Sequence, residues 1–215
     1  MHSHANPPWT RLAGTPLFER AMSLQAEDPR RHYHDSAHPV AIYGVARFVL
    51  QLPYDRALDL AIVSHDVIID TRGGCEMRSM DWLEDTLPDG ARDPDFAEAC
   101  RHIERTIWHR LDDDPRMVLL DLSGFADPVG RLGDTERLRR ECRDLHGMDG
   151  PAFAEKTLDY LGGLLVRVAP GSDALPDTFR QHHARICDGI SRTMNTLSRE
   201  MHPARIETGE REFDV

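Results

Sequence analysis

Residues 57–69 read ALDLAIVSHDVII, an almost continuous apolar run that carries the doublet His65-Asp66 within it. A run of this kind belongs in the interior of a domain, where an aspartate costs several kcal/mol unless it is paired, hydrogen-bonded or bound to a metal. Two other segments carry similar side chains: His34 and His38 precede the run, and a second apolar run, MVLLDL, contains Asp121. These residues together raise the hypothesis of a metal site.

Sequence periodicity predicts helices nearly throughout the chain, and therefore an all-α protein. Thr15 before Pro16, and Asp93 before Pro94, are typical of a helix N-cap followed by proline in the first turn. Asp55 is placed to cap the helix that carries His65, and we expect residues 67–69 to continue that helix. The further predicted helices cover residues 39–52, 76–87, 95–109, 135–145, 151–168 and 177–201.

Length and charge limit the classes of protein to which this chain can belong. A chain of 215 residues, of which 40% are hydrophobic, is long enough for one globular domain with a sizeable core. The formal net charge of −11 argues against electrostatic binding to a nucleic-acid backbone or an anionic membrane surface. We expect a single domain over residues 15–201, a flexible tail over 1–14 and a frayed tail over 202–215, and a homo-oligomer is left open.

The cysteines and the N-terminal segment indicate a cellular compartment. The four cysteines form no C-x-x-C pair, which argues against a zinc ribbon or a dithiol redox site. The N-terminal segment is polar, and neither a signal peptide nor an apolar run of membrane length is found in the sequence. We therefore expect a cytoplasmic protein with reduced thiols.

The candidate ligands lie where helices are expected to begin or end. Pro39 marks a first turn, so His38 projects from a helix start, with Asp35 or Ser36 as the cap. His65 and Asp66 are about 100° apart on a helix and can reach one ion only near the helix end. Imidazole and carboxylate ligands suit Mn, Fe, Co, Ni, Zn or Mg without choosing among them.

Each candidate has a simpler interpretation. His38 alone could be a capping or core histidine. Asp66 could pair with Arg31 or Arg78. Asp127 could replace Asp121 as the last ligand if the register is shifted. Glu76 and Glu141 read most simply as solvated helix charges.

The joint pattern resembles the HD superfamily of metal-dependent phosphohydrolases, and in particular small predicted phosphohydrolases whose first motif reads Arg-x-Tyr-His-Asn-x-x-His. The resemblance covers most of residues 30–195. The matching elements, in chain order, are RHYHDSAH over residues 31–38, His65-Asp66, Glu76-x-x-Ser79, Thr106-x-x-His109, Asp121-Leu-Ser and Leu138-Arg-Arg-Glu141. Asp35 departs from the asparagine of that group.

The resemblance implies an HD-type helical bundle and a role for each matching residue. The implied metal ligands are His38, His65, Asp66 and Asp121. Arg31 is expected to grip a substrate phosphate, Asp66 to orient the attacking water as well as to bind metal, and His34, Glu76 and His109 to serve proton transfer or to fix the ligands.

Substrate and metal count follow from the same resemblance. We expect a nucleotide or another small phosphorylated metabolite as substrate. The Glu76 segment contains no histidine, which favours one ion over two, although His102, Thr106 and His109 share a helical face that could hold a second. The Gly73-Gly74 loop is the best candidate for a lid. The alternatives are a di-iron oxygenase on the same fold and a non-catalytic module that binds a ligand or protein.

Overall fold

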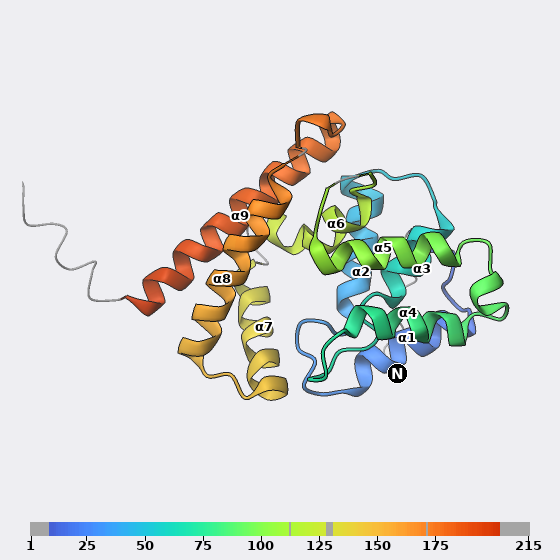
Figure 1. The fold of residues 1–215 in the computed structure, drawn as a ribbon, viewed down its shortest axis with the longest axis horizontal. Coiled ribbons are helices and arrows are strands. Elements are labelled where there is room, and N and C mark those ends of the chain that lie inside the picture. Colours follow the sequence, from blue (N-terminus) through green and yellow to red (C-terminus); the bar gives the residue numbers. More distant parts are fainter. Residues whose placement is uncertain (1–8, 112, 128–130, 171, 203–215) are drawn as a thin grey trace, which may run out of the picture.

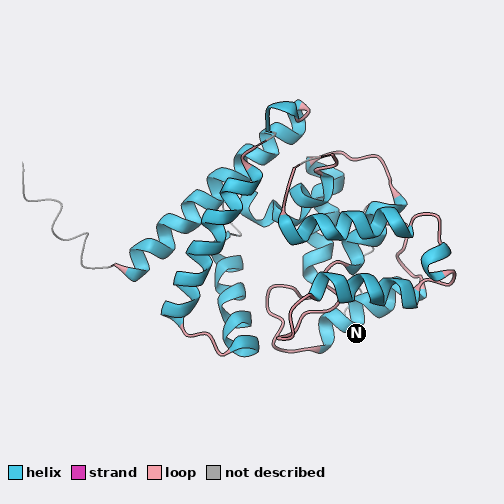
Figure 2. Ribbon diagram, in the orientation of Figure 1, coloured by secondary structure: helices cyan, strands magenta, loops and turns pink. Residues whose placement is uncertain are grey.

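The computed structural model describes residues 9–111, 113–127, 131–170 and 172–202, and over these residues the protein consists of helices joined by loops, without strands (Figure 2). The all-α prediction is confirmed. The helices, in chain order, are α1 (Pro16–Glu27), α2 (Ala37–Gly44), η1 (Val45–Val49), α3 (Arg56–Ser64), α4 (Cys75–Thr86), η2 (Gly90–Arg92), α5 (Phe96–Trp108), α6 (Arg116–Asp121), η3 (Leu122–Ala126), α7 (Arg131–His146), α8 (Gly150–Val168), η4 (Ser172–Ala174) and α9 (Asp177–Met201).

Two of the predicted caps begin their helices. The Thr15 side chain accepts a hydrogen bond from the backbone N–H of Phe18, directly ahead of Pro16 in α1. The Asp55 side chain likewise accepts from the N–H of Leu58 at the start of α3. Each bond satisfies an N–H that the first turn of a helix leaves without a partner.

Helix α3 is the central element of the first half of the protein. Every residue of α3 after Arg56 is buried, including the polar Asp59 and Ser64. Helices α1, α2, α4, α5 and α6 all contact α3, and Figure 1 shows them gathered into one group. The apolar run found in the sequence is therefore the core of the fold, and its C-terminal end lies among the ends of other helices.

Helices α7, α8 and α9 form the second group, which lies beside the first (Figure 1). The short helix η3 connects the groups, and the long helix α9 packs along it. This packing is close because a Cβ built on Gly189 of α9 would lie 1.8 Å from the carbonyl oxygen of Phe125 in η3. Glycine is the residue type that permits such an approach.

The expected flexible tail over residues 1–14 is wrong for its described part. Trp9 and Leu12 are buried in the core, and the Trp9 indole donates to the carbonyl of Leu52. Thr10 and the backbone N–H of Arg11 donate to the buried Asp59 carboxylate. The segment is thus tied to α3. Residues 1–8, and residues 203–215 of the expected C-terminal tail, lie outside the described residues.

Two predicted helices end differently from expectation. The helix expected over residues 39–52 is regular only to Gly44 and becomes a π-helical turn over Val45–Val49. The helix carrying His65 ends at Ser64, so residues 67–69 do not continue it. The second prediction was wrong because residues buried in a turn and residues buried in a helix are equally apolar in sequence.

The cysteines and helix lengths agree with two simpler expectations. All four cysteines are free thiols. No described helix combines the length and the apolar character needed to traverse a bilayer.

Candidate metal centre

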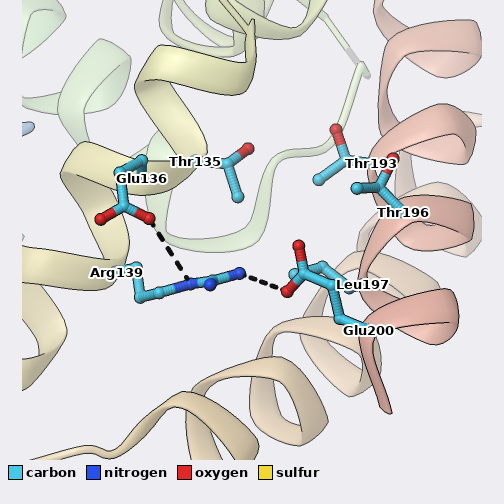
Figure 3. Close-up of a pocket in the computed structure, with 7 residues that line it drawn as sticks. All are labelled: Thr135, Glu136, Arg139, Thr193, Thr196, Leu197 and Glu200. Carbon is cyan, nitrogen blue, oxygen red and sulfur yellow. Dashed lines mark hydrogen bonds and ion pairs between the residues drawn. The ribbon is translucent and has the colours of Figure 1, made fainter. Parts of the chain in front are cut away.

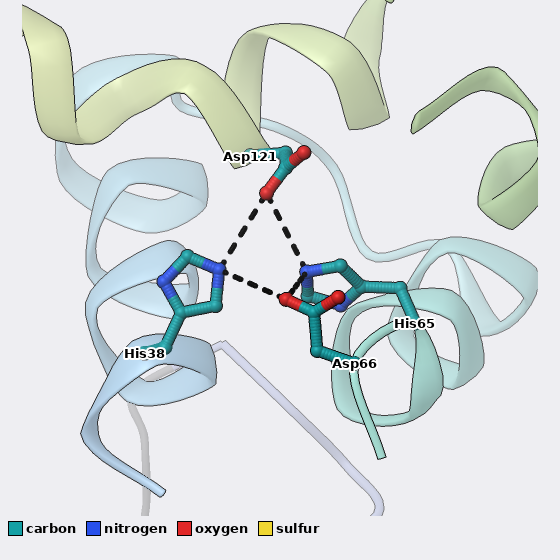
Figure 4. A group of neighbouring side chains, drawn as sticks. All are labelled: His38, His65, Asp66 and Asp121. Atoms are coloured by element: carbon teal, nitrogen blue, oxygen red, sulfur yellow. Dashed lines mark ion pairs between the residues drawn. The ribbon is translucent and has the colours of Figure 1, made fainter. Parts of the chain in front are cut away.

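Four predicted ligands meet where three helices begin or end (Figure 4). His38 lies in the first turn of α2, His65 follows the last residue of α3, and Asp66 comes directly after it. Asp121 is the last residue of α6. A turn after α3, rather than a continued helix, allows the adjacent His65 and Asp66 to face the same point.

The side-chain atoms of these four residues surround a common centre. The Nε2 atom of His38 lies 3.6 Å from Asp66 Oδ2 and 3.5 Å from Asp121 Oδ1. The Nε2 atom of His65 lies 3.1 Å and 3.5 Å from the same two oxygens. Both Nε2 atoms are buried and have no hydrogen-bond partner among the described residues. Two unpartnered nitrogens facing two carboxylates fit a divalent cation, which would accept a lone pair from each.

The electrostatics of the centre favour charged forms despite burial. Burial opposes ionisation of Asp66 and Asp121, but the neighbouring histidines hold the pKa of each carboxyl well below its usual range. Burial likewise opposes a protonated His65, yet Asp66 and Asp121 raise its pKa well above the usual value. The two carboxylates thus create a negative field that attracts a cation, whether a proton or a metal ion.

Neighbouring groups fix two of the ligands. The Nδ1 atom of His65 lies 3.0 Å from the carbonyl of Ile62, which directs Nε2 towards the centre. His109 contacts Asp121 Oδ2 at 3.0 Å and leaves Oδ1 facing the centre. His109 ends α5 with φ of +50°, a left-handed conformation that is uncommon for histidine and turns its ring towards α6. Such contacts orient metal ligands and set their tautomers.

His34 joins the centre through Glu141 of α7. One Glu141 oxygen lies 2.5 Å from His34 Nδ1, and the other accepts the backbone N–H groups of Tyr33 and His34. The Nε2 atom of His34 lies 3.9 Å from Asp66 Oδ2. Glu141 is only 3% exposed, so its interpretation as a solvated helix charge is wrong. The Arg-x-Glu spacing was the only signal of its role.

The Arg31 side chain supports the backbone around the centre. Its Nε donates to the carbonyl of His34, its Nη1 to the carbonyl of Val67, and its Nη2 to the carbonyl of Asp66. The guanidinium is buried, and three of its five N–H groups are engaged with backbone. It holds the His34 segment against the turn at Asp66, which explains its presence without a substrate.

The contacts of the side chains distinguish the alternative interpretations of Asp66 as an ion-pair partner and of Asp127 as the last ligand. Arg31 contacts the Asp66 carbonyl and not its carboxylate, and Arg78 pairs with Asp70. Asp121 lies in the cluster of ligand atoms, and Asp127 does not.

Two further expectations concern Glu76 and the helical face considered for a second ion. The Glu76 side chain, in the first turn of α4, makes no hydrogen bond or ion pair with any of the four ligands among the described residues. Thr106 donates to the carbonyl of Ile103, and His109 is engaged with Asp121, so these two do not form one site with His102. The possibility that these three residues together hold a second ion finds no support in these contacts.

Tyr160 of α8 was not anticipated from the sequence. Its ring is 48% exposed, and the guanidinium of Arg167 lies over it at 5.8 Å from the centroid. Partial burial and the negative charges of Asp121, Glu76 and Asp66 raise the pKa of Tyr160 to about 12. The carboxylates of the centre therefore act electrostatically on Tyr160 of the second helical group, and Arg167 lies beside it on the same helix.

A separate pocket lies between α7 and α9 (Figure 3). Arg139 spans it, with an ion pair to Glu200 at 2.5 Å and a second to Glu136 at 3.9 Å. The arginine is already neutralised by residues of the pocket itself. We therefore place the chemistry at the His and Asp cluster.

Comparison with known proteins identifies no relative: no family model, no curated protein and no solved structure matches this chain. The HD-type assignment stays a prediction from the motifs.

Proposed function

We propose that the protein is a metal-dependent phosphohydrolase that acts on a phosphoester of a nucleotide or another small phosphorylated metabolite. The observation that carries the proposal is the cluster of two orphaned imidazole nitrogens and two carboxylates at one point. The resemblance to HD-type phosphohydrolases supplies the reaction class, which the cluster alone does not choose.

The four ligands suit one divalent cation bound by His38, His65, Asp66 and Asp121, with Mn, Fe, Co, Ni, Zn and Mg all compatible. When bound, such an ion lowers the pKa of a coordinated water and polarises a phosphoryl oxygen. We assign substrate binding and proton transfer to side chains of this protein.

His34 is our candidate for proton transfer. Glu141 accepts the Nδ1 proton and holds the ring, so Nε2 is the atom left to exchange a proton with water or the leaving group. That atom lies 3.9 Å from Asp66 Oδ2, close enough for one water to contact both groups. We assign to His109 the role of positioning Asp121. Glu76 stays a candidate for proton transfer, although no contact joins it to the four ligands among the described residues.

We assign the phosphate contact to Arg167 and Tyr160 in place of Arg31. The Nε atom of Arg167 is buried without a hydrogen-bond partner, and its guanidinium makes no ion pair within the described residues. An uncommitted guanidinium is the group best suited to a phosphate, since its N–H groups match two phosphate oxygens. Tyr160 supplies a hydroxyl on the same helix face.

The test is phosphate release by metal-free protein reloaded with each candidate ion, assayed on nucleoside phosphates and p-nitrophenyl phosphate. We expect His34→Gln to lower turnover by about 10²–10⁴-fold while the protein keeps its metal. The matched control is His32→Gln, because the His32 side chain pairs only with Asp144 at the surface. Equal turnover in both variants would remove His34 from the mechanism.

The same preparation distinguishes the alternatives. Two bound irons with oxygen consumption, and no phosphate release, would support the oxygenase. Metal binding with no turnover on any substrate would support the non-catalytic module.

A further inference from the structure

A second cluster of ligand-type side chains lies on the far part of α5. Glu98 and His102 are one turn apart on this helix, and Asp114 lies in the segment just before α6. The Nε2 atom of His102 lies 3.8 Å from Glu98 Oε1 and 3.9 Å from Asp114 Oδ2. One ligand atom from each residue fits within 4.8 Å of the others.

His102 is the unusual member of this cluster. It has no exposed surface, and within the part of the chain that the structure describes neither of its ring nitrogens has a hydrogen-bond partner. A buried polar group without a partner costs about 1–3 kcal/mol. Since Nε2 faces two carboxylate oxygens, a cation among the three side chains would satisfy it.

Arginines surround the cluster and must be accounted for. Arg116 donates to both oxygens of Asp114, and Arg101 and Arg105 lie against Glu98. Through its backbone N–H, Nε and Nη2, Arg116 makes four hydrogen bonds to the two oxygens of Asp114, and a carboxylate has about four lone-pair directions. Asp114 would therefore bind an ion only by giving up part of this pairing. Of the described arginines only Arg105 lies near Glu98 Oε1, at 3.8 Å, so this is the freer carboxylate oxygen. The positive charges weaken the attraction for a cation, and we therefore expect lower affinity than at the first centre.

We propose that Glu98, His102 and Asp114 bind a second divalent cation, distinct from the candidate metal centre. One imidazole, two carboxylates and water are ligands that zinc accepts. The proposal stands on these residues alone and does not depend on the phosphohydrolase assignment.

The position of the cluster gives the ion a structural role. Helix α5 continues from His102 to His109, which contacts Asp121. Asp114 precedes α6, which ends at Asp121 itself. An ion between His102 and Asp114 would join the two elements that hold this ligand of the first centre.

The experiment counts zinc by plasma mass spectrometry after equilibration at about 10–100 µM free zinc, in the Asp66→Ala background. That background weakens the first centre equally in every variant. We expect Glu98→Gln and His102→Gln each to bind about one zinc fewer than Glu104→Gln, the matched control on an exposed position of the same helix. Zinc should also raise the unfolding temperature of the control but not of Glu98→Gln.

Equal zinc counts in Glu98→Gln and Glu104→Gln would overturn the proposal. Glu98 is partly exposed, so its substitution keeps the test decisive if the buried His102→Gln variant fails to fold. If the first centre binds no ion, Asp66→Ala and the parent protein will have the same zinc content, which is a different result.

Discussion

Replacing Glu141 by glutamine tests whether this buried carboxylate holds the His34 segment in place. Burial raises the pKa of Glu141, but the bond from His34 and the two backbone N–H groups outweigh it and lower the pKa from 4.5 to about 2. At about 1.4 kcal/mol per pKa unit, this corresponds to about 3 kcal/mol of folding free energy. Glutamine retains a carbonyl acceptor, so we expect Glu141→Gln to lose about 2 kcal/mol at pH 7.

The pH dependence has a definite sign. A carboxyl whose pKa is lowered by folding contributes stability above its unfolded pKa, and this contribution is lost as pH falls from about 4.5 towards 2. Burial lowers the pKa of His34, and the same contact helps to raise it. The free energy of this one contact is therefore counted only once, on Glu141.

Urea unfolding of chelator-treated protein measures the difference. The gap between the stabilities of the parent and Glu141→Gln should hold or widen from pH 7 to pH 5, because protonation of His34 strengthens its bond to Glu141. The gap should narrow below about pH 4.5, where Glu141 itself becomes protonated in the unfolded state. A gap under about 0.5 kcal/mol at pH 7, or one that does not change with pH, would contradict the assigned role. The matched control is Glu136→Gln on the same helix, whose carboxylate is half exposed and pairs with surface arginines.

Four further substitutions test the packing of the protein. Gly189→Ala should destabilise the protein by about 1–3 kcal/mol or more, because the new Cβ meets the Phe125 carbonyl. Gly162→Ala is the control: its Cβ meets only Met194 at 3.8 Å, so it should stabilise the protein by up to about 1 kcal/mol. Equal shifts of the unfolding temperature in the two variants would refute the close approach. Arg31→Ala should lower stability through the three carbonyls it leaves without donors, and a rise in KM with unchanged urea unfolding would restore it as a phosphate ligand. Trp9→Ala should cost about 3–5 kcal/mol by calorimetry, and a cost near zero would return this segment to a flexible tail.

The sequence predicted the elements that depend on local signals. Thr15 and Asp55 cap helices because their side chains serve N–H groups only three residues ahead. The place of His65 and Asp66 in a cluster of ligand-type side chains could also be predicted, because the two are costly in an apolar run unless they serve a common centre.

The remaining features depend on contacts between distant segments. Arg31 has the charge for a phosphate, yet it donates to carbonyls as far away as residue 67. Glu141 looks like an ordinary charged residue of a helix, and only the approach of α7 to residues 33 and 34 buries it. Trp9 lies near a polar N-terminal stretch, and its burial follows from a pairing with residue 52. No local pattern encodes these contacts.

Metal content is the most direct test of the central claim that His38, His65, Asp66 and Asp121 bind a divalent ion. Protein purified without chelator or metal-affinity resin is analysed by plasma mass spectrometry, beside Asp66→Ala, Asp121→Ala and the control Asp127→Ala. We predict that Asp66→Ala and Asp121→Ala each lose about one transition-metal ion per chain that the parent and Asp127→Ala retain. The same metal content in all four proteins, or no metal in any of them even after addition of Mn²⁺, would contradict the account.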